Sequence, residues 1–354
     1  MHTDFGDLPR QSDKTACGLF DVETFRNKCV SAGDAARTAA ALPWCLVSCR
    51  DLSMLVCSRF LRPARLCRAA LGLALPVLAA CQAQLDVDLD VRRAPAVQAL
   101  RLALPTVTLI DKDEATHVFD TSRSSVFDLY GVEDGTLQSL LSMDDAAAHY
   151  RGVSLQFDLD GANLNTDDGK TWPLTLLAQG DVVDIDFKLD DTDSKALVLS
   201  LELPFSLIDR RSSSEQDFAL RPVLRAALAS EAAEISGTIA RSAVEADDCR
   251  AGRSVGTGIA VYLYSGTDVT PTDYYRSDSV ISLTQPLASA RAQYDASDDA
   301  YRFTIAQLAP GDYTLSWTCQ ADGEHPDADD GLQFRGVASL SVSASDTSSL
   351  TFTE

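Results

Sequence analysis

Closely spaced aspartates come nearest to a chemical site in this chain. Asp184, Asp186 and Asp190 lie in and after one strand-like run, and Asp327 and Asp329 lie in a polar loop. Ca²⁺ takes roughly six to eight oxygen ligands, which alternating carboxylates supply when a tight turn brings them together. Calcium binding is one interpretation of these residues. A solvated hairpin loop is the favoured interpretation and needs no metal, and we therefore expect no cofactor.

Two adjacent tyrosines could stack against the ring of a sugar. Tyr274 and Tyr275 lie in a polar loop, where we expect them to be exposed. Aromatic side chains have a large apolar face and a polar tip, which suits such a contact. The alternative is that the aromatic residues of this chain pack in the core, as they do on most sandwich strands.

The chain carries no recognisable catalytic motif. His117, His149 and His325 are far apart in the sequence. No G-x-S-x-G elbow, P-loop or dinucleotide fingerprint is present. We therefore expect a protein that is not an enzyme.

An apolar run ending in a cysteine has the features of an export signal. Residues 69–80 are apolar, and four arginines precede them: Arg59, Arg62, Arg65 and Arg68. The run is too short to span a bilayer as a helix, which needs about 20 residues. A basic segment, a short apolar segment and small residues are typical of a secretory signal peptide, and we expect cleavage after Ala80.

The end of this run, Leu78-Ala79-Ala80-Cys81, resembles the lipobox of bacterial prolipoproteins at all four positions. The resemblance implies that Cys81 is lipidated on sulfur and becomes the first residue of the mature protein. It also implies a membrane-anchored lipoprotein, and Gln82 favours the outer membrane under the sorting rule of enteric bacteria. The alternative is a buried core helix that happens to end in cysteine.

The signal does not stand at the start of the chain. Met54 opens a leader of ordinary length, whereas the 53 residues before it show no convincing periodicity. We expect that translation starts near Met54; an unusually long leader is the alternative. In either case residues 1–80 do not belong to the folded part.

Two further cysteines follow Cys81, and the lipobox resemblance leaves them free to pair with each other. Cys249 and Cys319 would lie in an oxidising compartment, where disulfides persist. We predict a Cys249–Cys319 disulfide. Residues 81–354 contain no CxxC motif, so a zinc site is not expected.

The elements that would position these residues read as β-strands. Short runs with period-two alternation recur with turn residues between them, for example 153–159, 182–189, 259–263 and 301–305. Such spacing predicts an all-β chain of two consecutive β-sandwich domains behind a lipoprotein signal peptide. We expect an acidic tether over 81–98, a first sandwich over 99–229, a linker over 230–233 and a second sandwich over 234–354.

Each expected domain resembles a known family. Tyr150-Arg151-Gly152-Val153-Ser154-Leu155 and Leu220-Arg221-Pro222-Val223 are similar to motifs of the bacterial domain of unknown function 4382, which implies no activity. The run from Tyr301 to Leu315 resembles carboxypeptidase-regulatory-like modules, with a transthyretin-like or starch-binding-like sandwich. That second resemblance implies a spacer, a stabilising unit, or an adhesive or carbohydrate-contacting unit.

Charge narrows the class of partner. Of the 30 Lys and Arg and 52 Asp and Glu of the chain, 20 and 45 lie in residues 81–354, giving a net charge of about −25. Nucleic acid is not an expected partner, because phosphate backbones need positive charge. We expect a non-enzymatic binding or structural module of the cell envelope, with an unknown protein or glycan ligand. The alternative is a carbohydrate-binding component of an envelope glycan system.

Overall fold

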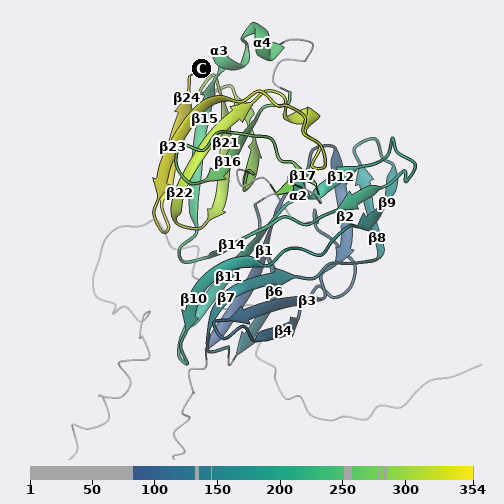
Figure 1. Cartoon of the computed structure of the whole chain (residues 1–354), viewed down its shortest axis with the longest axis vertical. Coiled ribbons are helices and arrows are strands. Elements are labelled where there is room, and N and C mark those ends of the chain that lie inside the picture. Colours follow the sequence, from purple (N-terminus) through teal and green to yellow (C-terminus); the bar gives the residue numbers. More distant parts are fainter. Residues whose placement is uncertain are drawn as a thin grey trace, which may run out of the picture. The chain divides into compact units, whose positions relative to one another are not determined.

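Strands make up nearly all the regular structure in the described part of the chain (Figure 1). The computed structural model describes residues 83–131, 135–144, 146–250, 257–277, 280–281 and 285–353. They all belong to one unit, residues 77–354. Within these ranges no helix is long and apolar enough to cross a membrane. The predicted all-β fold class is confirmed.

Between residues 83 and 229 the structure describes fourteen strands, which form three sheets in the orders β14-β11-β1-β6, β10-β7-β3-β4 and β12-β13-β9-β8-β2-β5. Their bounds are β1 Gln84–Arg92, β2 Val97–Ala103, β3 Thr106–Asp111, β4 Thr116–Asp120, β5 Phe127–Asp128, β6 Gln138–Asp144, β7 Ala148–Leu155, β8 Asp158–Thr166, β9 Thr171–Leu176, β10 Val183–Leu189, β11 Ser194–Glu202, β12 Leu207–Asp209, β13 Phe218–Leu220 and β14 Leu224–Leu228. A single helical turn, α2 (Leu203–Ser206), follows β11. We call this part the first domain.

One hydrophobic core serves all three sheets of the first domain. Leu85 of β1, Leu100 of β2 and Leu109 of β3 are fully buried and belong to the same cluster. Alternate residues of a strand point to opposite faces, so each strand supplies every second side chain to this core. The period-two pattern of the sequence therefore sets which face of each strand is buried.

The predicted tether is wrong, because its residues form a central strand. β1 pairs in parallel with β11 and antiparallel with β6. Leu85, Val87 and Leu89 have 0% of their surface exposed. The alternation of Leu or Val with Asp, interpreted as an acidic spacer, is the pattern of a strand with one apolar face. The folded part thus begins well before residue 99.

Ten further strands form the second domain, in the sheet orders β20-β21-β15-β24, β19-β16-β22-β23 and β17-β18. Their bounds are β15 Ala233–Ala240, β16 Ala260–Ser265, β17 Arg276–Ser277, β18 Val280–Ile281, β19 Ala288–Arg291, β20 Gln293–Asp295, β21 Ala300–Leu308, β22 Gly311–Thr318, β23 Arg335–Val342 and β24 Thr347–Phe352. Short helical turns are α3 Arg241–Val244, α4 Asp247–Arg250 and η1 Ala321–Gly323.

The core of the second domain lies around the fully buried Trp317 of β22. β15 crosses it between β21 and β24, and Gly237 allows the closest approach there. A Cβ atom at Gly237 would lie 2.3 Å from the Leu350 carbonyl oxygen and 2.6 Å from the Phe303 ring. Only glycine fits at this position without a shift of the backbone.

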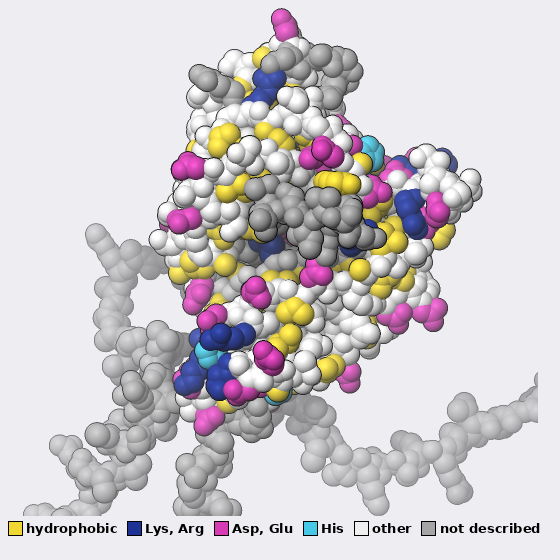
Figure 2. Space-filling model, viewed as in Figure 1, with side chains coloured by type: hydrophobic (Ala, Val, Ile, Leu, Met, Phe, Trp, Pro, Cys, Tyr) yellow, Lys and Arg dark blue, Asp and Glu magenta, His cyan; other side chains and the backbone are white. Residues whose placement is uncertain are grey.

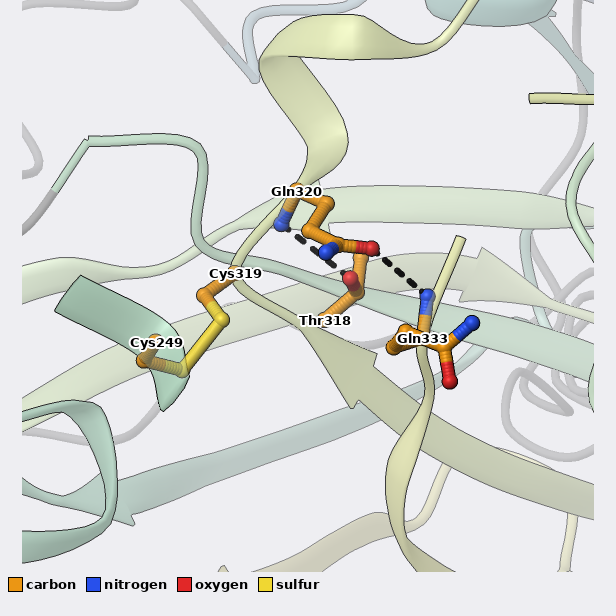
Figure 3. The surroundings of a disulfide bond; sticks show 5 residues. All are labelled: Cys249, Thr318, Cys319, Gln320 and Gln333. Carbon is orange, nitrogen blue, oxygen red and sulfur yellow. Dashed lines mark hydrogen bonds between the residues drawn. A yellow bond between two sulfur atoms is a disulfide. The ribbon is translucent and has the colours of Figure 1, made fainter. Parts of the chain in front are cut away.

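The predicted Cys249–Cys319 disulfide is present (Figure 3). It joins α4 to the residue that follows β22, with 5.6 Å between the two Cα atoms. Beside it, the Gln320 backbone N–H donates to Thr318 Oγ1 at 3.1 Å, and Gln320 Oε1 accepts from the Gln333 N–H at 2.7 Å. The bridge therefore ties the α4 segment to a loop that hydrogen bonds already hold.

Candidate binding surface

Among the phenylalanine, tyrosine and tryptophan residues described, Tyr294 of β20 is the most exposed, with 46% of its surface accessible. Three neighbours hold it in place. Its hydroxyl donates to Asp299 Oδ1 at 2.6 Å, and the Arg241 guanidinium lies 5.7 Å from the ring centre. The buried ring of Tyr301 lies 5.4 Å away, centre to centre. An exposed ring fixed in this way loses little conformational entropy when a partner covers it.

A tight hairpin between β20 and β21 positions Asp299. Asp295 opens the turn by accepting a hydrogen bond from the Ser297 N–H at 2.9 Å. Asp299 closes it with a φ of 51°, in the left-handed region that Asp tolerates better than most residues. The turn thereby brings the Asp299 carboxylate under the Tyr294 hydroxyl.

The charged groups around Tyr294 form ion pairs with one another. Arg241, the first residue of α3, contacts Asp299 at 3.0 Å and Glu245 at 2.6 Å. The Tyr294 hydroxyl and then Arg241 hold the pKa of Asp299 below its usual range, and the same hydrogen bond raises the pKa of Tyr294. Next to them, Arg302 contacts Asp295 at 2.8 Å. Arg302 also pairs with Asp298, so two arginines face four carboxylates, and the result is a set of paired donors and acceptors with a small acidic excess.

Two open hollows adjoin the hairpin, of about 440 and 510 Å³. Tyr294, Gln293 and Arg302 line the first, and Arg241 and Asp299 line the second. An aromatic face beside fixed donors and acceptors can bind a ligand that has both apolar and hydroxyl or amide groups. We call Arg241, Gln293, Tyr294, Asp299 and Arg302 the Tyr294 surface.

Elsewhere the face in view carries scattered acidic side chains, with basic side chains gathered in a few clusters among them (Figure 2). One such cluster, with histidine beside it, lies over β10 and β7. The charge excess of the sequence is thus spread over the surface rather than concentrated in one acidic patch on this face.

The structure contradicts the predicted sugar contact at Tyr274. This side chain is only 3% exposed, and its ring stacks on Phe205 of α2 at 4.6 Å between centres. Phe205 belongs to the first domain, and a single sequence does not reveal that such a ring will cover the loop. Tyr275 is half-buried. The pair therefore does not form an exposed aromatic platform.

The predicted calcium ligands do not converge. Asp184 and Asp186 are exposed on β10, and Asp186 Oδ1 lies 2.5 Å from His149 Nε2, while Asp190 pairs with Lys188. Asp327 and Asp329 are exposed in the loop after η1, where Asp329 accepts a backbone hydrogen bond from residue 331. Nowhere in the described ranges do three acidic, histidine or cysteine side chains form a group that could hold a metal ion.

Two predicted sites lie outside the described residues: the cleavage site at Ala80 and the lipidation site at Cys81. The Tyr294 surface, in contrast, was missed from the sequence. Its signal is an aromatic residue directly before Asp295-Ala296-Ser297-Asp298-Asp299, a run of turn-forming residues that predicts an exposed hairpin.

Comparisons with known proteins give only distant likenesses. No family model matches the chain, and no curated protein matches it. Among solved structures it is similar to the Bacillus anthracis TIE protein (8% identity, 77% of this chain, 33% of that chain, TM-score 0.18). It is also similar to the minor pilin GBS52 of Streptococcus agalactiae (12% identity, 76% and 94%, TM-score 0.17).

A third likeness is to the fimbrial anchor protein Mfa2 from Porphyromonas gingivalis (11% identity, 74% and 99%, TM-score 0.17). The chain spans about a third of the length of the first of these proteins. At such TM-scores the matches carry no conclusion about what this chain does.

Proposed function

We propose that the chain is a non-enzymatic binding module of the bacterial cell envelope, anchored by lipid on Cys81 and contacting its ligand through the Tyr294 surface. The observation that carries the proposal is an exposed Tyr294 ring held by Asp299, Arg241 and Tyr301. Tyr and Arg are the residue types most enriched among the energetically dominant contacts of interfaces.

The family resemblances are part of the same proposal. The first domain is assigned to the domain of unknown function 4382, and the second to the carboxypeptidase-regulatory-like modules. The second assignment is supported by β21 and β22, whose side chains Tyr301, Phe303 and Tyr313 are buried. The residues of the resemblance thus occupy two strands that follow each other in the chain, one in each of the two main sheets of the second domain.

Anchoring is tested by expressing the full chain in a diderm bacterial host beside a Cys81→Ser variant. We expect the parent to partition into membranes and to begin at a lipidated Cys81 by intact mass. The variant should be released or remain unprocessed. A soluble parent that keeps residues 1–80 would contradict the anchoring.

A carbohydrate is the ligand class that the Tyr294 surface favours. The Arg241 and Arg302 side chains of this surface are already paired with carboxylates, so a neutral ligand with many hydroxyl groups suits it better than a strongly charged one. Fixed Arg and Asp side chains offer donors and acceptors together, and the ring offers an apolar face.

This assignment is tested on an array of bacterial and host glycans. We expect Tyr294→Ala to weaken binding of a responsive glycan at least about tenfold, as loss of a central aromatic contact does. Tyr294→Phe is the matched control, since it keeps the ring and loses only the hydrogen bond to Asp299. If no glycan binds the parent, the carbohydrate assignment fails.

A further inference from the structure

One arginine connects the two β domains. Arg225 of β14 is 8% exposed, and its Nε donates to Glu202 Oε1 of β11 at 2.8 Å. Its other nitrogens reach the second domain: Nη1 donates to the Gln307 carbonyl at 2.7 Å and Nη2 to the Ala306 carbonyl at 3.3 Å. A single guanidinium thus binds a carboxylate of one domain and two carbonyls of the other.

Glu202 prevents Arg225 from leaving this position. The glutamate is 0% exposed, and within the described residues its Oε2 has no hydrogen-bond partner. Its charge is compensated mainly by Arg225, which contacts Oε1, and to a lesser extent by Arg92. Removing one partner of a buried ion pair is strongly unfavourable, because the other charge is left uncompensated. Movement of Arg225 away from Glu202 would be opposed for the same reason.

Two further contacts between the domains also oppose a change in their relative orientation. Arg92 of β1 also donates to the Ala306 carbonyl, at 3.4 Å. The Phe205 ring of α2 lies parallel to Tyr274 and contacts Tyr262 of β16 at 5.7 Å between centres. These rings form a buried cluster of their own, separate from the two domain cores. The connection therefore has a polar part at Arg225 and an apolar part at Phe205.

We infer that the Glu202–Arg225 pair, with these two contacts, locks the two β domains in one fixed relative orientation. Arg225 is a positioning residue in this arrangement. The fixed orientation does not depend on a ligand at the Tyr294 surface, so this inference can be tested separately from the proposed function.

The test is a distance measurement on the full chain. Spin labels are attached to p-acetylphenylalanine at positions 118 and 337, since Val118 of β4 and Val337 of β23 are 63% and 57% exposed. Ketone chemistry leaves the cysteines unlabelled. We expect the parent to give one narrow distance distribution by double electron–electron resonance.

The variant Glu202→Leu/Arg225→Met removes the pair without stranding a buried charge. We expect it to broaden the distribution severalfold, with β-sheet circular dichroism unchanged. Arg225→Lys is a second variant that keeps a charge beside Glu202 but cannot reach both carbonyls, and it should broaden the distribution less. Arg101→Met, a half-exposed arginine of the first domain, is the control and should leave the distribution narrow. A broad distribution in the parent, or equally narrow ones in both Arg225 variants, would overturn the inference.

Discussion

At the scale of single residues, Glu324 is a buried carboxylate whose ionisation affects stability. Its Oε2 accepts a hydrogen bond from the Tyr262 hydroxyl at 2.6 Å, while Oε1 is buried with no partner among the described residues. Burial, followed by the nearby Asp273 and Asp330 charges, raises the pKa of Glu324 to about 7 against the Tyr262 hydrogen bond. Ionisation of this group therefore opposes folding near neutral pH.

This pKa predicts a pH dependence opposite to that of most carboxylates. The native state binds the Glu324 proton more tightly than the unfolded chain does, so the free energy of unfolding falls as pH rises from about 4.5 to about 7. Glu324→Gln should remove most of this slope. At pH 8 it should raise the free energy of unfolding by at most about 3–4 kcal/mol, at about 1.4 kcal/mol for each pKa unit.

Urea unfolding of both proteins at pH 5 and pH 8 measures the effect. Glu231→Gln changes an exposed glutamate and serves as the control. We expect its free energy of unfolding to depend on pH as that of the parent does. A Glu324→Gln protein that keeps the slope of the parent would show that Glu324 titrates normally.

At the scale of elements, β1 shows that a short acidic segment can be a core strand. Leu89 is fully buried, whereas its neighbour Asp88 points to the opposite, partly exposed face. Leu89→Ala should lower the free energy of unfolding by about 2–5 kcal/mol, as for other buried leucines. Asp88→Asn should change it little. If Leu89→Ala were as mild as Asp88→Asn in urea unfolding, β1 would not be a core strand in solution.

Period-two alternation was sufficient to predict most strands. Residues 301–305 and 182–189 lie almost entirely within β21 and β10. The same rule applies to β1, but the aspartates on its outer face led to its interpretation as a tether. Composition was misleading there because only the buried face of a strand must be apolar.

The candidate site was harder to predict because contacts distant in sequence decide exposure. Tyr274 lies in a polar loop, yet Phe205, about 70 residues earlier, covers it. Tyr294 lies on a short strand and is exposed because β20 is at the edge of its sheet. Neither fact follows from local sequence, whereas the disulfide could be predicted because only two cysteines remained to pair.

At the scale of the whole molecule, the disulfide closes a long covalent loop in the second domain, because its cysteines are 70 positions apart in the sequence. Cys249→Ser/Cys319→Ser should lower the free energy of unfolding by about 2–5 kcal/mol, because the bridge restricts the unfolded chain. Urea unfolding of the parent with and without a reductant gives the comparison. The parent and the variant should coincide in reductant, and a variant as stable as the oxidised parent would contradict the role of the bridge.

The position of β1 also governs how the chain can fold while it is being made. Among the strands of the described residues β1 is synthesised first, yet its parallel partner β11 spans Ser194–Glu202. Asp90 and Ser200, which face each other across this pair, are 110 residues apart. One hydrogen-bonding edge of β1 therefore stays unpaired until more than a hundred further residues have been made, and such long-range pairing is slow. A chain delivered across a membrane while unfolded, as the proposed leader implies, would gain from this delay, because its first domain cannot close before β11 has been translated.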